Sequence, residues 1–133
     1  MTRVFCDTSV LIRYFVEDDI PRAVAATDLI ESDTMLTIST GVILEAVHVL
    51  RTEHGFVNPA LAGLLATFLS RSNVDVADAD KLGLIGALYW TEMFSARRIA
   101  DAVLVAAAQQ AGVDAIVTFD EKMTSPSVPV RLL

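Results

Sequence analysis

The sequence is short of several residue types, and each shortage excludes a class of protein. Cys6 is the only cysteine, so no internal disulfide can form and a reducing cytosol is the expected environment. The longest apolar stretches, such as 102–108, are far too short to cross a bilayer. Arg3, Asp7 and Arg13 interrupt the apolar residues near the start, so we expect no secretory signal. These features predict a cytoplasmic protein that does not bind a membrane.

Basic residues are also scarce. The chain has 10 lysine and arginine residues against 17 aspartate and glutamate residues, and its net charge is −7. Proteins that bind nucleic acids usually carry a basic surface instead. The acidic balance either serves solubility or includes carboxylates gathered to hold divalent cations, which reverse the local field and can bind phosphate. Composition alone is compatible with both interpretations.

Apolar residues, by contrast, are plentiful. They make up 53% of 133 residues, which suffices for one compact core, so we expect a single domain over residues 1–133. Short apolar runs predict strands at 4–6, 35–39, 74–77, 115–117 and 128–132. Helical patterns lie between them, including 9–16, 21–30 and 99–111, with starts predicted at Thr40, at Asn58 and at Asp78 or Asp80, and ends at Gly55 and Gly112. This alternation predicts an α/β fold, a three-layer α/β/α sandwich around a central, mostly parallel sheet.

Four acidic residues occupy comparable places in this pattern. Asp7 and Asp120 directly follow two predicted strands. Asp101 lies in the first turn of a helix that is apolar around its whole circumference, and Glu45 flanks the apolar stripe of its own helix. Taken singly, each has an ordinary interpretation as a helix cap, a turn residue or an exposed helix acid. Because ligands of parallel sheets bind beyond the carboxyl ends of the strands, the four together predict one acidic site.

Gathered carboxylates need a counter-charge, since like charges at close range raise each other's pKa. Oxygen ligands favour Mg²⁺ or Mn²⁺ over zinc, and His48 and His54 lack zinc-ligand spacing with Cys6. One or two such ions can activate a water molecule and stabilise charge on a phosphate during in-line displacement. The sequence offers no serine–histidine or cysteine–histidine pairing as an alternative nucleophile. It therefore favours metal-dependent hydrolysis of phosphodiester bonds.

Four segments of the sequence resemble a known family. V-F-C-D-T-S-V-L-I, I-L-E-A-V-H-V-L, R-R-I-A-D-A-V-L-V-A-A-A and V-T-F-D-E-K follow in this order over nearly the whole chain and resemble the PIN-domain family. Within it, the length and motif order are similar to the VapC-type toxins of bacterial toxin–antitoxin pairs. The resemblance implies a Mg²⁺- or Mn²⁺-dependent endoribonuclease that forms a homodimer. It also implies a cognate antitoxin protein that blocks the site and helps to repress the shared operon, so that operator DNA is bound only through the antitoxin.

The resemblance also assigns roles to individual residues. The residues that match the acidic metal-binding positions are Asp7, Glu45, Asp101 and Asp120. The hydroxyl residues that match positions beside them, where they would orient carboxylates or waters as a second shell, are Thr8, Ser9 and Thr118. The candidates for contact with RNA phosphates are Arg97 and Arg98, followed by Lys122 and Arg13. Ordinary solvation of a helix surface is the alternative interpretation of these basic residues.

Other functions compete with this one. A non-catalytic PIN fold that serves as a protein-interaction module is less favoured, because the acidic set is complete. A phosphotransfer protein, such as a receiver domain or a phosphatase with an aspartyl nucleophile, usually needs a second acid near the end of the first strand, where this chain has Thr8, Ser9 and Val10. A nuclease acting on DNA remains an alternative, because the metal chemistry does not distinguish the two sugars.

Overall fold

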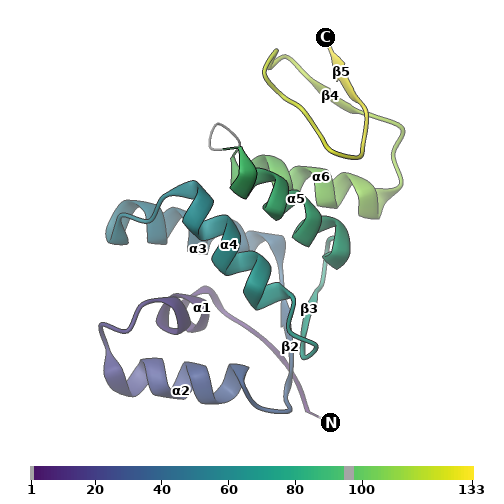
Figure 1. Cartoon of the computed structure of the whole chain (residues 1–133). Helices are drawn as coiled ribbons and strands as arrows, with labels where there is room; N and C mark the ends of the chain where they lie inside the picture. Colours follow the sequence, from purple (N-terminus) through teal and green to yellow (C-terminus); the bar gives the residue numbers. More distant parts are fainter. Residues whose placement is uncertain (1, 95–97) are drawn as a thin grey trace.

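Strands and helices alternate along the chain as the sequence predicts (Figure 1). The structure is a computed structural model that describes residues 2–94 and 98–133. Its strands are β1 (Arg3–Phe5), β2 (Met35–Ile38), β3 (Val74–Val76), β4 (Ile116–Thr118) and β5 (Val130–Leu132). Its helices are α1 (Thr8–Phe15), α2 (Ile20–Ile30), α3 (Thr40–His54), α4 (Asn58–Leu69), α5 (Lys81–Met93) and α6 (Ile99–Ala111). The predicted α/β class with parallel strands is confirmed.

Within the described residues, the strands form two parallel sheets. The first has the order β1-β2-β3, with Val4 beside Leu36 and Leu36 beside Val74. The second pairs β4 with β5 and aligns Ile116 with Val130. Figure 1 shows β4 and β5 on the far side of α6 from the three-stranded sheet. The sequence does not reveal this division, because a short apolar run indicates a strand but does not specify its partner.

The larger apolar cluster lies between one face of the three-stranded sheet and the helices. Each of the helices α1 to α6 contributes buried residues to it. On the sheet, the residues that face the cluster are Val4, Leu36, Ile38, Val74 and Val76. The opposite face is more open, since Phe5 and Asp75, which both align with Thr37, are exposed. The first sheet is therefore held in place mainly through one face.

Helix α6 lies between two apolar clusters. Ala102 and Val103 belong to the larger one, whereas Val105 packs with Ile116 and Met123 in a smaller one beside β4 and β5. A helix that is apolar around its whole circumference is predicted to be buried. Helix α6 is buried toward both clusters, whereas its Leu104 is 46% exposed. The position of α6 fixes the direction in which its first turn presents polar groups.

The start of α3 differs from the predicted one. Ser39, not Thr40, is the N-cap, and its hydroxyl oxygen accepts a hydrogen bond from the Val42 N–H at 3.2 Å. Thr40 donates instead to the carboxylate of Asp78, from its N–H at 2.9 Å and from its hydroxyl at 2.7 Å. Serine and threonine are both good caps, so the local sequence could not decide between them.

The other helix ends mostly follow the local sequence. Gly55 and Gly112 end α3 and α6 with φ angles of 69° and 67°, a left-handed conformation that glycine adopts without steric cost. Asp80 caps α5, which settles the two predicted alternatives. The predicted cap Asn58 lies inside α4, and Val57 takes the N-cap position. In the part of the chain that the structure describes, no helix combines the length and apolarity needed to span a membrane.

Candidate active site

Asp7 links the end of β1 to the beginning of α1. It is the N-cap of α1, and its carboxylate accepts hydrogen bonds from the Ser9 hydroxyl at 2.8 Å and the Ser9 N–H at 3.4 Å. The Ser9 hydroxyl, followed by the Ser9 N–H, stabilises the ionised carboxylate and so lowers the pKa of Asp7. The capping role is therefore present, and it leaves an exposed negative charge at the end of β1.

Thr8 connects this corner to α3. Its side chain is almost completely buried, with 7% of the residue exposed. Its hydroxyl donates a hydrogen bond to Glu45 Oε2 at 3.0 Å. The residue directly after Asp7 thus holds the carboxylate of Glu45, which comes from a different helix. The resemblance implies that Thr8 orients a carboxylate or a water, and its hydrogen bond to Glu45 is compatible with the first of these roles.

Asp101 occupies the first turn of α6, where the partial positive charge of the helix N-terminus favours a carboxylate. Its side chain is 18% exposed, and Oδ1 lies 3.4 Å from Arg98 Nη2. Arg98 itself stands at the N-cap position of α6, and its side chain is 63% exposed. A carboxylate near a buried helix start must be satisfied by backbone N–H groups, a cation or a metal. Arg98 supplies a cation.

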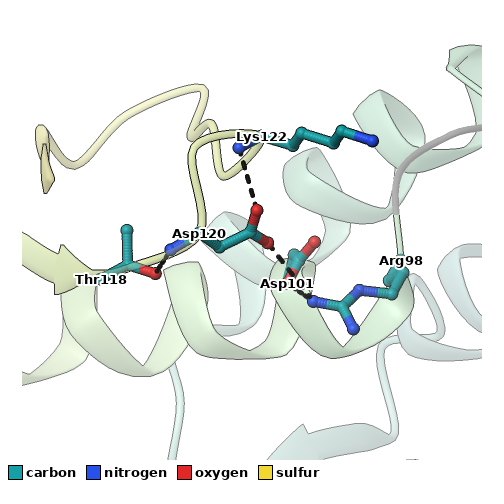
Figure 2. Close-up of polar contacts among 5 residues, drawn as sticks. All are labelled: Arg98, Asp101, Thr118, Asp120 and Lys122. Carbon is teal, nitrogen blue, oxygen red and sulfur yellow. Dashed lines mark hydrogen bonds and ion pairs between the residues drawn. The ribbon is translucent and has the colours of Figure 1, made fainter.

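Asp120 lies in the turn that follows β4. Its N–H donates to the Thr118 hydroxyl oxygen at 3.0 Å, and its Oδ1 accepts from the Lys122 N–H at 2.9 Å. Its Oδ2 lies 3.9 Å from Arg98 Nη2 (Figure 2). Asp120 is thus a turn residue, which is the ordinary interpretation of its position in the sequence. Its Oδ2 also points toward α6.

Arg98 brings two of the predicted acids together. Asp101 Oδ1 and Asp120 Oδ2 both lie within ion-pair distance of the same guanidinium nitrogen. Figure 2 shows this nitrogen beside the two carboxylates, one on α6 and one on the loop after β4. Two carboxylates from consecutive elements, α6 and the turn after β4, therefore converge on one positive charge.

The four predicted acids form two groups. Thr8 links Glu45 to the corner of Asp7, and Arg98 links Asp101 to Asp120. Across residues 2–94 and 98–133, no three side chains of histidine, cysteine, aspartate or glutamate are grouped closely enough to hold a metal ion. The division has a physical reason, since Asp7 and Asp120 follow strands of different sheets.

The predicted RNA-binding residues have different surroundings. Arg98 faces Asp101 and Asp120, as described above. Arg13 donates to Asp18 Oδ1 at 2.7 Å in an ion pair on the surface near the end of α1. Lys122 lies in the same turn as Asp120, and its N–H binds that carboxylate. Arg97 lies outside the described residues.

The chemistry of the Asp101–Asp120 pair fits a divalent cation. The two oxygens already face one positive charge, and Mg²⁺ is commonly bound through one or two carboxylates, with waters and phosphates completing its coordination. The soft ligand Cys6 does not compete, because its thiol is buried. Burial, and then the negative charge of Asp7, raises the pKa of Cys6 and keeps the sulfur protonated.

Sequence reasoning missed one feature of the site, the pairing of Arg98 with both acids. The pairing of Arg98 with Asp101 could have been predicted from the sequence, because residues three apart are neighbours on a helix surface. The pairing with Asp120 depends on how the chain after β4 returns along α6, and no local pattern reports that path.

Comparison with known proteins agrees with the fold. A search of curated proteins gives no match to this chain. The PIN domain, as a family, matches residues 4–127, a range that runs from β1 past Asp120 and contains all four predicted acids. Since the match covers most of the sequence, the chain belongs to the PIN domain family.

Proposed function

We propose that this chain is a metal-dependent endoribonuclease that uses Mg²⁺ or Mn²⁺. PIN domains are generally nucleases and generally bind divalent metal ions. The observation that carries the proposal is the convergence of Asp101 Oδ1 and Asp120 Oδ2 on one positive charge. Their all-oxygen donor chemistry suits a hard cation and not zinc.

In this proposal, Asp101 and Asp120 hold one ion, and Glu45 and Asp7 lie at the second acidic corner of the site. A divalent cation supplies charge stabilisation to the phosphate and acidifies the attacking water. The low exposure of Asp101 strengthens its interaction with any cation, because less water screens the charge. Thr8 fixes Glu45, and Ser9 fixes Asp7, so two of the four carboxylates are already oriented by neighbouring hydroxyls.

RNA binding rests on few positive charges. Arg98 is an exposed cation beside the acids, and the further candidates are Arg97, Lys122 and Arg13. With a net charge of −7, the chain has little general attraction for a polyanion. We therefore infer that RNA is recognised through a small number of phosphate contacts close to the metal.

We further propose that the chain is the toxin of a type II toxin–antitoxin pair and acts in the cytoplasm as a homodimer. The chain length and the order of its four motifs support this role. A cognate antitoxin would block the site and bind operator DNA. Helix α5 exposes the large apolar side chains of Leu82 and Met93, which offers surface for a protein partner.

The nuclease proposal is tested with purified protein and a labelled single-stranded RNA. Cleavage is expected with Mn²⁺ or Mg²⁺ and is expected to stop on addition of EDTA. Asp101→Asn should lower the rate by about 100-fold or more, because a lost metal ligand removes several kcal/mol of charge stabilisation. Asp28→Asn, which changes an exposed acid on α2, is the matched control and should leave the rate unchanged.

Three outcomes of this assay discriminate between the functions. Cleavage that persists in EDTA would contradict the metal-dependent mechanism. Faster cleavage of single-stranded DNA of the same sequence would favour the DNA nuclease. A folded protein that binds Mn²⁺ but cleaves neither nucleic acid would favour the non-catalytic interaction module.

The toxin proposal needs a separate test in cells. Expression of the chain alone should arrest growth of a bacterial host, and the Asp101→Asn variant should not. A short, partly basic reading frame is expected immediately upstream, and its co-expression should restore growth. Unimpaired growth at high levels of the wild-type chain would contradict the toxin role and leave the nuclease proposal standing.

A further inference from the structure

Arg98 faces the same two carboxylates that would hold the metal. Its Nη2 lies 3.4 Å from Asp101 Oδ1 and 3.9 Å from Asp120 Oδ2. Figure 2 shows the guanidinium group beside both acids at the start of α6. An ion coordinated by these two oxygens would occupy the space that the guanidinium group now faces, so Arg98 and the ion compete for the pair.

We propose that Arg98 is an internal counter-cation that a divalent ion displaces and that then binds a phosphate of the RNA. This inference rests on the proposed metal-dependent nuclease function. It gives Arg98 two successive partners, the carboxylates of Asp101 and Asp120 without metal, and the substrate with metal. Arg98 is thus a positioning residue for both the acids and the RNA.

The carboxylates of Asp101 and Asp120 need a positive counter-charge. Asp101 and Asp120 repel each other when both are ionised, and without a counter-charge that repulsion would push the loop after β4 away from α6. The guanidinium group stays protonated at any physiological pH, so it neutralises part of this charge. A divalent ion carries twice the charge and binds carboxylate oxygens directly, so it competes successfully for the same pair.

The contacts that Arg98 makes with Asp101 and Asp120 are weak. Charge-assisted hydrogen bonds between arginine and carboxylate are usually about 2.7–2.9 Å long, and the Arg13–Asp18 pair is in that range at 2.7 Å. Both contacts of Arg98 are longer, and 63% of its side chain is exposed. Although Asp101 is only 18% exposed, an ion pair this long with one largely exposed partner contributes little free energy. Arg98 can therefore leave the carboxylates at low cost.

The displaced side chain of Arg98 would lie close to a phosphate of the bound RNA. A phosphate that approaches an ion held by Asp101 and Asp120 would arrive beside the first turn of α6, which Arg98 precedes. The planar guanidinium group matches the geometry of phosphate oxygens. The residue that leaves the acids is thus already next to the place where the RNA is expected. Few other positive charges are available to a chain of net charge −7.

The experiment measures Mn²⁺ binding in the absence of RNA, by electron paramagnetic resonance of the free ion at low ionic strength. Arg98→Ala should bind Mn²⁺ about three- to fivefold more tightly than wild type, the size of effect that an exposed ion pair provides. Arg98→Lys keeps the charge and should stay close to wild type. The advantage of Arg98→Ala should shrink in salt, which screens exposed charges.

Arg22→Ala is the matched control. Arg22 also makes an ion pair in the first turn of a helix, with Asp19 three residues away, at 3.5 Å from Nε to Oδ2. Its side chain is 71% exposed, similar to that of Arg98. Its removal changes the net charge by the same amount but does not touch Asp101 or Asp120, so Mn²⁺ affinity should stay at the wild-type value.

A second measurement follows the RNA. Binding of a fluorescent, 2′-O-methylated RNA that cannot be cleaved is measured by anisotropy in saturating Mn²⁺. Arg98→Ala should weaken this binding by about fivefold or more, as expected for loss of a phosphate contact. Arg98→Lys should recover part of the loss. The opposite signs of the two effects, tighter metal and weaker RNA, distinguish the proposal from a purely structural role of Arg98.

The outcomes distinguish the proposed role of Arg98 from the nuclease function on which it rests. If wild type binds Mn²⁺ and Arg98→Ala binds it no more tightly than Arg22→Ala, the counter-cation role is overturned and the nuclease proposal stands. If neither wild type nor Arg98→Ala binds Mn²⁺, both proposals fail. Tighter Mn²⁺ binding with unchanged RNA binding would overturn the phosphate contact.

Discussion

The hydrogen bond between Thr8 and Glu45 is the contact best suited to testing the acidic corner near β1. Thr8→Val keeps the shape and the branched Cβ of the side chain but removes the hydroxyl that donates to Glu45 Oε2 at 3.0 Å. The variant should be less stable, and its nuclease activity should fall because Glu45 loses its fixed orientation.

The expected loss of stability is about 1 kcal/mol. Hydrogen bonds to charged groups contribute about 1.5–3 kcal/mol. Glu45 lies on the surface, so water can replace the lost donor, and the new methyl group occupies a buried position, so both effects reduce the loss. With an unfolding entropy of about 2 cal/mol/K per residue, a change of this size lowers the Tm of a chain of 133 residues by about 4 °C.

Thermal and urea unfolding of four variants form the assay. Thr8→Val and Glu45→Ala are measured singly and together, and the double-mutant cycle isolates their interaction. Thr8→Ser, which keeps a hydroxyl, serves as the control and should retain most of the coupling to Glu45. The reasoning is refuted if Thr8→Val matches wild type in stability, or if the cycle shows no coupling between residues 8 and 45.

Three further predictions test the local structure. Ser9→Ala removes the main donor to Asp7, so NMR titration should show the pKa of Asp7 rising toward its ordinary value. In the wild type that pKa is lowered by folding, so ionised Asp7 stabilises the protein above its unfolded-state pKa, and this contribution is lost as the pH falls through the folded-state pKa; an unchanged titration in Ser9→Ala would contradict the assignment. Ser39→Ala should cost about 1 kcal/mol in urea unfolding, and Ser39→Asp should not. Gly55→Ala should also cost about 1 kcal/mol through its positive φ alone, because among the described residues no atom beyond its chain neighbours lies within 4 Å of the added Cβ, and equal stability would exclude backbone strain there.

Local features of the fold could be predicted well from the sequence. The glycines that end α3 and α6 stand directly after apolar helical patterns, and the apolar circumference of α6 indicated its burial on more than one side. These signals act within a few residues of the chain, so they need no knowledge of tertiary contacts. The cap of α3 is the informative exception. Asp78 binds Thr40 from 38 residues away, and no local pattern reports that contact.

The candidate site shows the same limit on a larger scale. The sequence singled out each of the four acids from its place after a strand or near the start of the following helix, and their assignment to one site stays a prediction. Asp101 was expected to need backbone N–H groups, a cation or a metal, and Arg98 lies 3.4 Å from its carboxylate. The grouping of the acids depends on strand partners. Because β4 pairs with β5 and not with β1, the structure joins Asp120 to Asp101 and leaves Asp7 with the corner of Glu45. Strand order is a long-range property that short apolar runs do not encode.

The two apolar clusters on either side of α6 differ greatly in size, and this has a consequence for local opening. The smaller one has four buried residues, Val105, Ile116, Met123 and Val128, so β4 and β5 should open more often than the rest of the chain. Asp101 belongs to the helix that both clusters share, whereas Asp120 belongs to the weaker unit. An ion bound by both would tether that unit to α6. Amide hydrogens of β4 and β5 would then exchange more slowly with metal than after chelation, while those of β2 would be nearly indifferent.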